Sequence, residues 1–151
     1  MSKNAHFIDH FLSHREVTKE LISKIDSDHY SYKPTPTSME AEKLVNHILE
    51  SMYSFARFAN KQQPEKLFGE GDTSDLVKRA DIYTEETVKL ISSLSDEDFE
   101  QMIDVSQIFG KEVSAGQLLT IAVEHEIHHK GNLFVYVREM GHTELPLYIK
   151  S

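Results

Sequence analysis

Histidine is the residue type that most clearly offers chemistry in this 151-residue chain, because it occurs nine times while cysteine is absent. Three histidines fall within five positions, at His125, His128 and His129. The lack of cysteine excludes a disulfide framework, a thiolate zinc site and a cysteine nucleophile. A transition-metal site in this chain must therefore be built from histidine, aspartate or glutamate.

The spacing of His125 and His129 is that of two neighbours on one face of a helix. At about 100° per residue they lie within about 40° of each other and one turn apart. Their face also carries Leu118, Ala122, Leu133, Tyr136 and Met140. We therefore expect both imidazoles to point inward, where two neutral rings can share a metal while each donates its other N–H to a further acceptor. His128 projects about 100° away from His129, so we do not expect it to be a ligand.

A pair of histidines does not complete a catalytic zinc site, which typically has three protein ligands and one open position. His47 is the best candidate for the third ligand, since it lies in the middle of a predicted helix, beside Leu44 and at the border of its apolar stripe. His10 and His14 share the same four-residue spacing, but they fall between the apolar residues of their segment. We expect them on a solvated face.

Two other motifs overlap the late histidine segment. His125-Glu126-Ile-His-His129 satisfies the H-E-x-x-H pattern of zinc proteases, with Glu126 as general base. The extended protease form needs a further histidine at position 135, which is Val135, and no sheet is expected to form a peptide cleft. Glu126-x-x-His129 also matches half of a di-iron signature, but no second inward E-x-x-H exists. Both readings are therefore disfavoured.

Two further residues of this segment have open roles. Glu126 lies about 100° from His125, so it could support the site or acid–base chemistry, or simply be solvated. Tyr136 shares the ligand face, where it could donate a hydrogen bond to a substrate or serve as a core aromatic. The second role is favoured for Tyr136.

The elements that must position these residues are predicted to be helices. Apolar residues recur at spacings of three and four over 5–26, 39–61, 74–94 and 114–140. Thr37 and Glu40 are predicted to form a capping box for the second helix, with Ser38 as a competing N-cap. Ser114 and Gln117 are predicted to form one for the last helix, which should stop at Gly141. Residues 95–113 fit either a loop or a short two-stranded excursion. The pattern predicts an all-α, antiparallel four-helix bundle that forms one domain over residues 1–151.

The charge and hydropathy of the chain limit the kinds of partner that it is expected to bind. The chain has 25 acidic against 16 basic side chains, a net charge of −9, which disfavours binding to nucleic acid. No stretch approaches the roughly 20 apolar residues needed to span a bilayer. The amino-terminal residues lack a basic region followed by an apolar core, so no signal peptide is expected. These features predict a cytoplasmic protein without a membrane association.

The sequence resembles the DinB family over nearly its whole length. The resemblance is carried by four segments: Tyr32-Lys-Pro-Thr-Pro36, Leu44-Val-Asn-His47-Ile48, the run from Glu124 to Asn132, and Val137-Arg-Glu-Met-Gly141. Two departures are Lys130, where arginine is usual, and Asn132, where glutamine is usual. The resemblance implies that His47, His125 and His129 are the metal ligands. It also implies a homodimer and an ion such as zinc or nickel.

The resemblance further indicates the chemistry, since relatives in the wider superfamily use the metal in reactions that depend on a low-molecular-weight thiol. The leading hypothesis is thus a metal-dependent S-transferase, isomerase or hydrolase with one divalent ion, Zn before Ni, Fe or Cu. Its small-molecule substrate or cosubstrate would have to supply the sulfur, because the chain has none in cysteine. No catalytic residue is predicted. The alternative is a non-catalytic, stress-associated bundle that binds a metal or another ligand.

Overall fold

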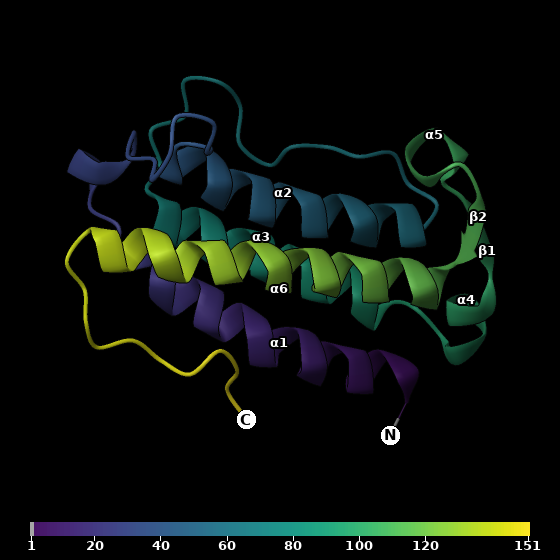
Figure 1. The fold of residues 1–151 in the computed structure, drawn as a ribbon. Coiled ribbons are helices and arrows are strands. Elements are labelled where there is room, and N and C mark those ends of the chain that lie inside the picture. Colours follow the sequence, from purple (N-terminus) through teal and green to yellow (C-terminus); the bar gives the residue numbers. More distant parts are fainter. Residues whose placement is uncertain (1) are drawn as a thin grey trace.

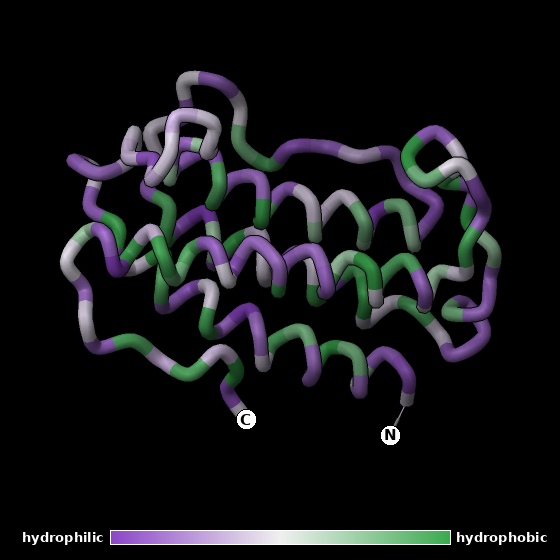
Figure 2. Tube along the Cα trace, viewed as in Figure 1, coloured by the Kyte–Doolittle hydropathy of each residue, from purple (hydrophilic) through white to green (hydrophobic). Residues whose placement is uncertain are grey.

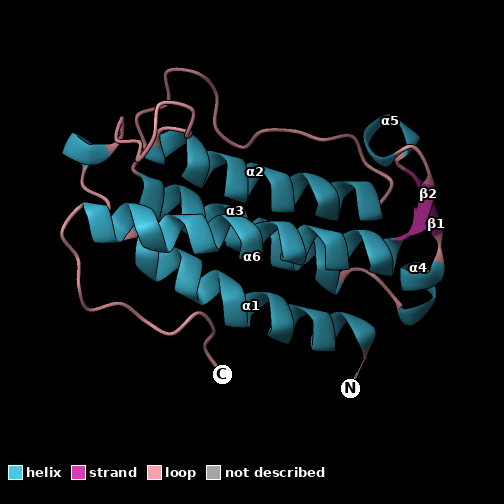
Figure 3. Ribbon diagram, in the orientation of Figure 1, coloured by secondary structure: helices cyan, strands magenta, loops and turns pink. Residues whose placement is uncertain are grey.

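The protein is mostly helical, with one small sheet. The computed structural model describes residues 2–151 (Figures 1 and 3). The elements in chain order are α1 (Lys3–Ile22), the 3-10 helix η1 (Ser27–His29), α2 (Ala41–Ala59), α3 (Leu76–Ser92), α4 (Asp96–Glu100), β1 (Met102–Asp104), α5 (Ser106–Phe109), β2 (Glu112–Ser114) and α6 (Ala115–Glu139). The long helices thus lie where the apolar periodicity predicted them, within a few residues at each end.

The start of α6 is fixed by the predicted capping box. The hydroxyl of Ser114 accepts a hydrogen bond from the Gln117 backbone N–H (3.1 Å), and the Gln117 side chain accepts one from the Ser114 N–H (3.0 Å). Two of the unpaired N–H groups at the helix start are therefore satisfied. After the last turn Gly141 has φ = 102°, a left-handed conformation in which glycine avoids the strain of a side chain. Both predicted ends of α6 are confirmed.

The predicted capping box of α2 is wrong. The N-cap residue is Glu40, whose side chain makes no capping hydrogen bond. Backbone carbonyls of the preceding loop satisfy the first N–H groups instead, since Ala41 N–H donates to the carbonyl of Tyr32 (2.8 Å) and Glu42 N–H to that of Tyr30 (3.0 Å). The helix start needs no side-chain cap because the loop folds back onto it.

Residues 95–113 form the two-stranded alternative. Ser95 caps the short α4 through a reciprocal pair of bonds with Asp98. Strands β1 and β2 then pair antiparallel, with Ile103 opposite Val113, and α5 connects them. Both Ile103 and Val113 are buried, so the base of this hairpin is anchored in the core.

The long helices pack against one another, but not every neighbouring pair is antiparallel. The Asn60 side chain at the end of α2 donates to the carbonyl of Leu90 near the end of α3 (3.1 Å), while Arg79 and Asn46 are bonded near the two helix starts (3.3 Å). Helices α2 and α3 are therefore parallel. The antiparallel prediction is wrong for this pair because residues 60–75 run back along α2 (Figure 1). Sixteen extended residues reach about 50 Å, well beyond the roughly 28 Å length of α2.

The core lies between the long helices. Hydrophobic and hydrophilic residues alternate along each of them (Figure 2). One buried cluster contains residues of α1, α2, α3 and α6, among them Leu21, Tyr83 and Leu133. A second cluster contains residues of the same four helices and of the hairpin, among them Met52, Leu118 and Val113. Among residues 2–151, no helix combines the length and apolar character that crossing a bilayer requires.

Candidate metal centre

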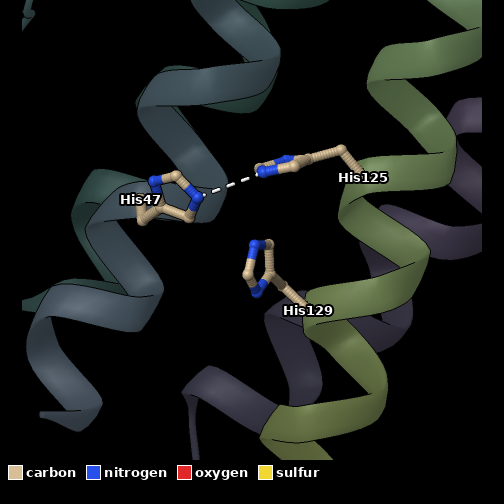
Figure 4. Close-up of side chains that lie close together, drawn as sticks. All are labelled: His47, His125 and His129. Atoms are coloured by element: carbon tan, nitrogen blue, oxygen red, sulfur yellow. Dashed lines mark hydrogen bonds between the residues drawn. The ribbon is translucent and has the colours of Figure 1, made fainter. Parts of the chain in front are cut away.

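The three predicted ligand residues meet between α2 and α6. His47 from α2 and His125 and His129 from α6 direct their rings toward one another (Figure 4). The Nε2 atoms of His47 and His125 are 3.1 Å apart, and each residue offers one nitrogen within 4.8 Å of the others. The ring centroids are separated by 4.8 Å for His47–His125 and His47–His129, and by 4.5 Å for His125–His129. Seventy-eight residues separate His47 from His125 in the chain.

Helical periodicity explains this convergence. His125 and His129 lie one turn apart on the face of α6 that packs against α2, so their rings follow one another along the same side. His47 lies between the buried Leu44 and Ile48 on α2. All three histidines are half-buried, so they lie at the border of the core. His128 is exposed, and it is outside the cluster although its ring centroid is 4.8 Å from that of His129.

The electrostatics of the cluster favour neutral imidazoles. Burial lowers the pKa of His125, with a further contribution from His47. Burial also lowers the pKa of His129, to about 4, and the neighbouring His125 adds to this effect. At neutral pH both rings are therefore unprotonated, which is the form that binds a metal ion.

The donor set fits a divalent transition-metal ion. Zinc–nitrogen bonds of about 2.0–2.1 Å in a tetrahedral site place two ligand nitrogens about 3.3 Å apart, close to the 3.1 Å between His47 and His125. The buried Nδ1 of His129 has no hydrogen-bond partner among the described residues. Buried imidazole nitrogens are normally paired, so the side chains alone do not satisfy this cluster. Three imidazoles without a thiolate suit Zn, Ni, Cu or Fe.

Glu126 is neither solvated nor part of the cluster. It is 1% exposed and accepts hydrogen bonds from Arg15 (Nε to Oε2, 2.8 Å) and from the Thr18 hydroxyl (3.0 Å). Arg15, itself 0% exposed, also donates to Thr84 (3.1 Å). This pairing on the α1 side of α6 is inconsistent with Glu126 as the general base of a zinc protease.

His14 corrects a second expectation. It is 4% exposed rather than solvated, and its Nδ1 lies 2.7 Å from the ammonium of Lys130. Burial and the Lys130 charge lower its pKa. Lys130 is buried too, and it also donates to the carbonyl of Tyr148 in the carboxyl-terminal segment. His10 is exposed, as predicted.

A sequence signal for these buried polar residues existed. His14, Arg15 and Thr18 continue the three- and four-residue spacing of Phe11 and Leu21, so they occupy positions of the apolar stripe of α1. Polar residues at stripe positions indicate buried partners. Tyr136 is a core aromatic, since it is buried and its hydroxyl donates to the carbonyl of Met39 (2.7 Å).

The fold and the cluster together define a mostly helical protein in which two helices bring three histidines to one point. The chain belongs to the DinB family, whose sequence profile matches residues 1–151. It is 50% identical over 157 aligned residues to the uncharacterised protein YjoA of Bacillus subtilis strain 168, an alignment that spans 98% of this chain and 97% of that protein.

Solved structures show the same fold. The crystal structure of the DinB-like protein YjoA from Bacillus subtilis matches with a TM-score of 0.87 over 97% of this chain and 99% of that one. A DinB-like protein from Bacillus cereus ATCC 10987 matches with a TM-score of 0.75 at 19% identity, over 93% of each chain. The second match shows that the fold persists where most of the sequence differs.

Proposed function

We propose that this protein is a metal-dependent enzyme that acts with a low-molecular-weight thiol, as an S-transferase, isomerase or hydrolase. One divalent ion, zinc before nickel, iron or copper, is held by His47, His125 and His129 in a one-domain four-helix bundle. The observation that carries the proposal is the convergence of three histidine nitrogens within 4.8 Å. The lowered pKa values of His125 and His129 support it, because neutral rings are ready to bind an ion.

The side chains of the site have distinct tasks in this proposal. The three imidazoles hold the ion and leave part of its coordination sphere for a ligand. When bound, the ion supplies positive charge that lowers the pKa of a thiol or a water molecule beside it. Ser51, whose hydroxyl is 3.5 Å from Nδ1 of His47, restricts the orientation of that ring. The thiol comes from a cosubstrate, because the chain contains no cysteine.

The second candidate function is a protein that binds a metal or another ligand without turnover. One observation favours it. Glu126 is the carboxylate next to His125 in the sequence. Its side chain forms an ion pair with Arg15 on the α1 side of α6 and so points away from the cluster. A protein that only binds a ligand needs no acid–base group at the cluster.

The metal site is tested by elemental analysis of protein purified without an affinity tag. We expect about one ion per chain in the wild type, and its loss in His47→Ala, His125→Ala and His129→Ala. His128→Ala is the matched control, since its ring is beside His129 but outside the cluster, and it should retain the ion. Full occupancy in the His47→Ala variant would refute the three-histidine site.

Turnover is tested separately with a panel of low-molecular-weight thiols and electrophiles. The enzyme proposal predicts thiol-dependent product formation that disappears with a chelator and in His125→Ala. A protein that holds stoichiometric metal but forms no product with any member of the panel supports the binding function instead.

We also propose that the protein is a cytoplasmic homodimer. The dimer rests on the family resemblance, and the cytoplasmic location rests on the absence of cysteine. Sedimentation equilibrium of the full chain tests the dimer. A single species of 17.4 kDa would refute it.

A further inference from the structure

The hairpin between α4 and α6 brings an aromatic side chain toward the histidine cluster. Phe109 at the end of α5 stacks on Phe55 of α2, with ring centroids 6.1 Å apart and planes inclined by 20°. Phe55 in turn meets the ring of His125 edge-on, at 6.5 Å and 77°. A continuous row of three rings therefore leads from the tip of the hairpin to one of the candidate ligands.

The hairpin holds Phe109 in a fixed position. The backbone N–H of Phe109 donates to the carbonyl of Val105 (2.8 Å), and Gly110 closes the turn with φ = 72°, a left-handed conformation. Val105 is buried, so the turn is attached to the core. Phe109 nevertheless keeps 38% of its surface exposed, which leaves apolar area free at the end of the row of rings away from His125.

Two buried basic residues, Arg15 of α1 and Lys130 of α6, are engaged away from the cluster. Both lie in their own pairs on the other side of α6. At this end of the cluster the ring that contacts His125 is that of Phe55, so apolar contact is available there for recognition.

We propose that Phe55 and Phe109 form an apolar subsite that binds the aromatic or branched aliphatic group of a thiol whose sulfur is directed at the histidine cluster. The row of rings places Phe55 in edge-on contact with His125, one of the candidate ligands. The subsite rests on the proposed function, and it specifies the substrate class as hydrophobic thiols or their conjugates.

The test uses the full-length protein loaded with Co²⁺, which binds nitrogen sites of this kind and reports a thiol ligand by its absorption spectrum. Phenylmethanethiol and 2-mercaptoethanol are titrated in turn, and the dissociation constant of each is read from the spectrum. We expect Phe109→Ala to weaken phenylmethanethiol about tenfold, while the constant for 2-mercaptoethanol changes less than about twofold. Phe55→Leu, which keeps an apolar side chain but removes the ring, should act in the same direction.

Ile108→Ala is the matched control. Ile108 is the preceding residue of the same turn and is also exposed, but it faces a separate groove with Phe58 and Gln62. It should change neither constant. Circular dichroism establishes that each variant is folded.

The outcomes separate the two proposals. If wild-type protein binds no cobalt, the proposed function fails and the subsite fails with it. If cobalt binds but neither thiol does, the subsite is overturned and the thiol-dependent function is contradicted with it. If thiols bind, the subsite alone is overturned when Phe109→Ala changes both constants equally or changes neither.

Discussion

Replacing Arg15 with methionine should destabilise this protein more than most single substitutions. Arg15 and Glu126 are 0% and 1% exposed, and two hydrogen bonds join them, at 2.8 and 2.5 Å. Arg15→Met leaves the carboxylate of Glu126 buried with only the Thr18 hydroxyl as partner. Hydrogen bonds to charged groups contribute about 1.5–3 kcal/mol each, and removing one partner of a buried ion pair costs about 3–5 kcal/mol.

We therefore expect the free energy of unfolding to fall by about 4 kcal/mol, a large share of the roughly 5–15 kcal/mol typical of a folded domain. In a chain of this length the thermal midpoint should fall by roughly 8–16 °C. Urea unfolding followed by circular dichroism measures the change, with the slope of the transition unchanged. Lys89→Met, which removes an exposed pair with Glu86, is the control and should leave the midpoint where it is.

The double variant Arg15→Met/Glu126→Leu tests the cause. If the cost comes from an uncompensated buried charge, an apolar pair of similar volume should recover most of the lost stability. A double variant no more stable than Arg15→Met, or a loss below about 1 kcal/mol in the single variant, would refute the reasoning.

Three further predictions concern protonation, capping and the carboxyl-terminal segment. Burial holds the pKa of His129 at about 4, below its ordinary value of 6.5, so the unfolded chain binds more protons than the folded chain between these two pH values. The free energy of unfolding of the metal-free protein should therefore fall as the pH drops from 6.5 to about 4, and it should fall less in His129→Ala. Ser114→Ala removes the N-cap of α6 and should cost about 1 kcal/mol in urea unfolding, and an unchanged midpoint would contradict the capping argument. Deleting residues 145–151 removes the carbonyl of Tyr148 from the buried Lys130 and should cost about 1–3 kcal/mol, more than Lys150→Ala at the exposed pair with Glu20.

The sequence predicted the parts of this structure that depend on local periodicity and local hydrogen bonding. Apolar residues spaced by three and four located the long helices, and the Ser114–Gln117 pair located the start of α6. The same periodicity placed His125 and His129 on one face and His128 off it, as the structure has them. The assignment of His47 as their partner depended on the family resemblance as well.

Features that depend on partners from distant segments were not predicted. The spacing of apolar residues predicts a helix but not which way it runs beside its neighbour. The connection 60–75 is long enough for α3 to pack parallel or antiparallel to α2, so the sequence could not predict the parallel packing that the structure shows. His14 was expected on a solvated face and the role of Glu126 was left open, because their partners, Lys130 and Arg15, lie 116 and 111 residues away. A helical wheel describes one helix at a time and cannot pair residues across such distances.

Because His47 and His125 are far apart in the chain, an ion bound by the histidine cluster would affect folding as well as chemistry. An ion held by both helices would close a loop of 78 residues and so act as a cross-link on the chain. The chain-entropy model for a disulfide across such a loop gives a stabilisation of about 4–5 kcal/mol. Contacts between residues so far apart in the sequence form slowly, because the chain loses the entropy of closing the loop before packing contributes any stabilisation. Ion binding would therefore oppose unfolding by joining α2 to α6. The thermal midpoint of unfolding would then rise with the concentration of the metal ion.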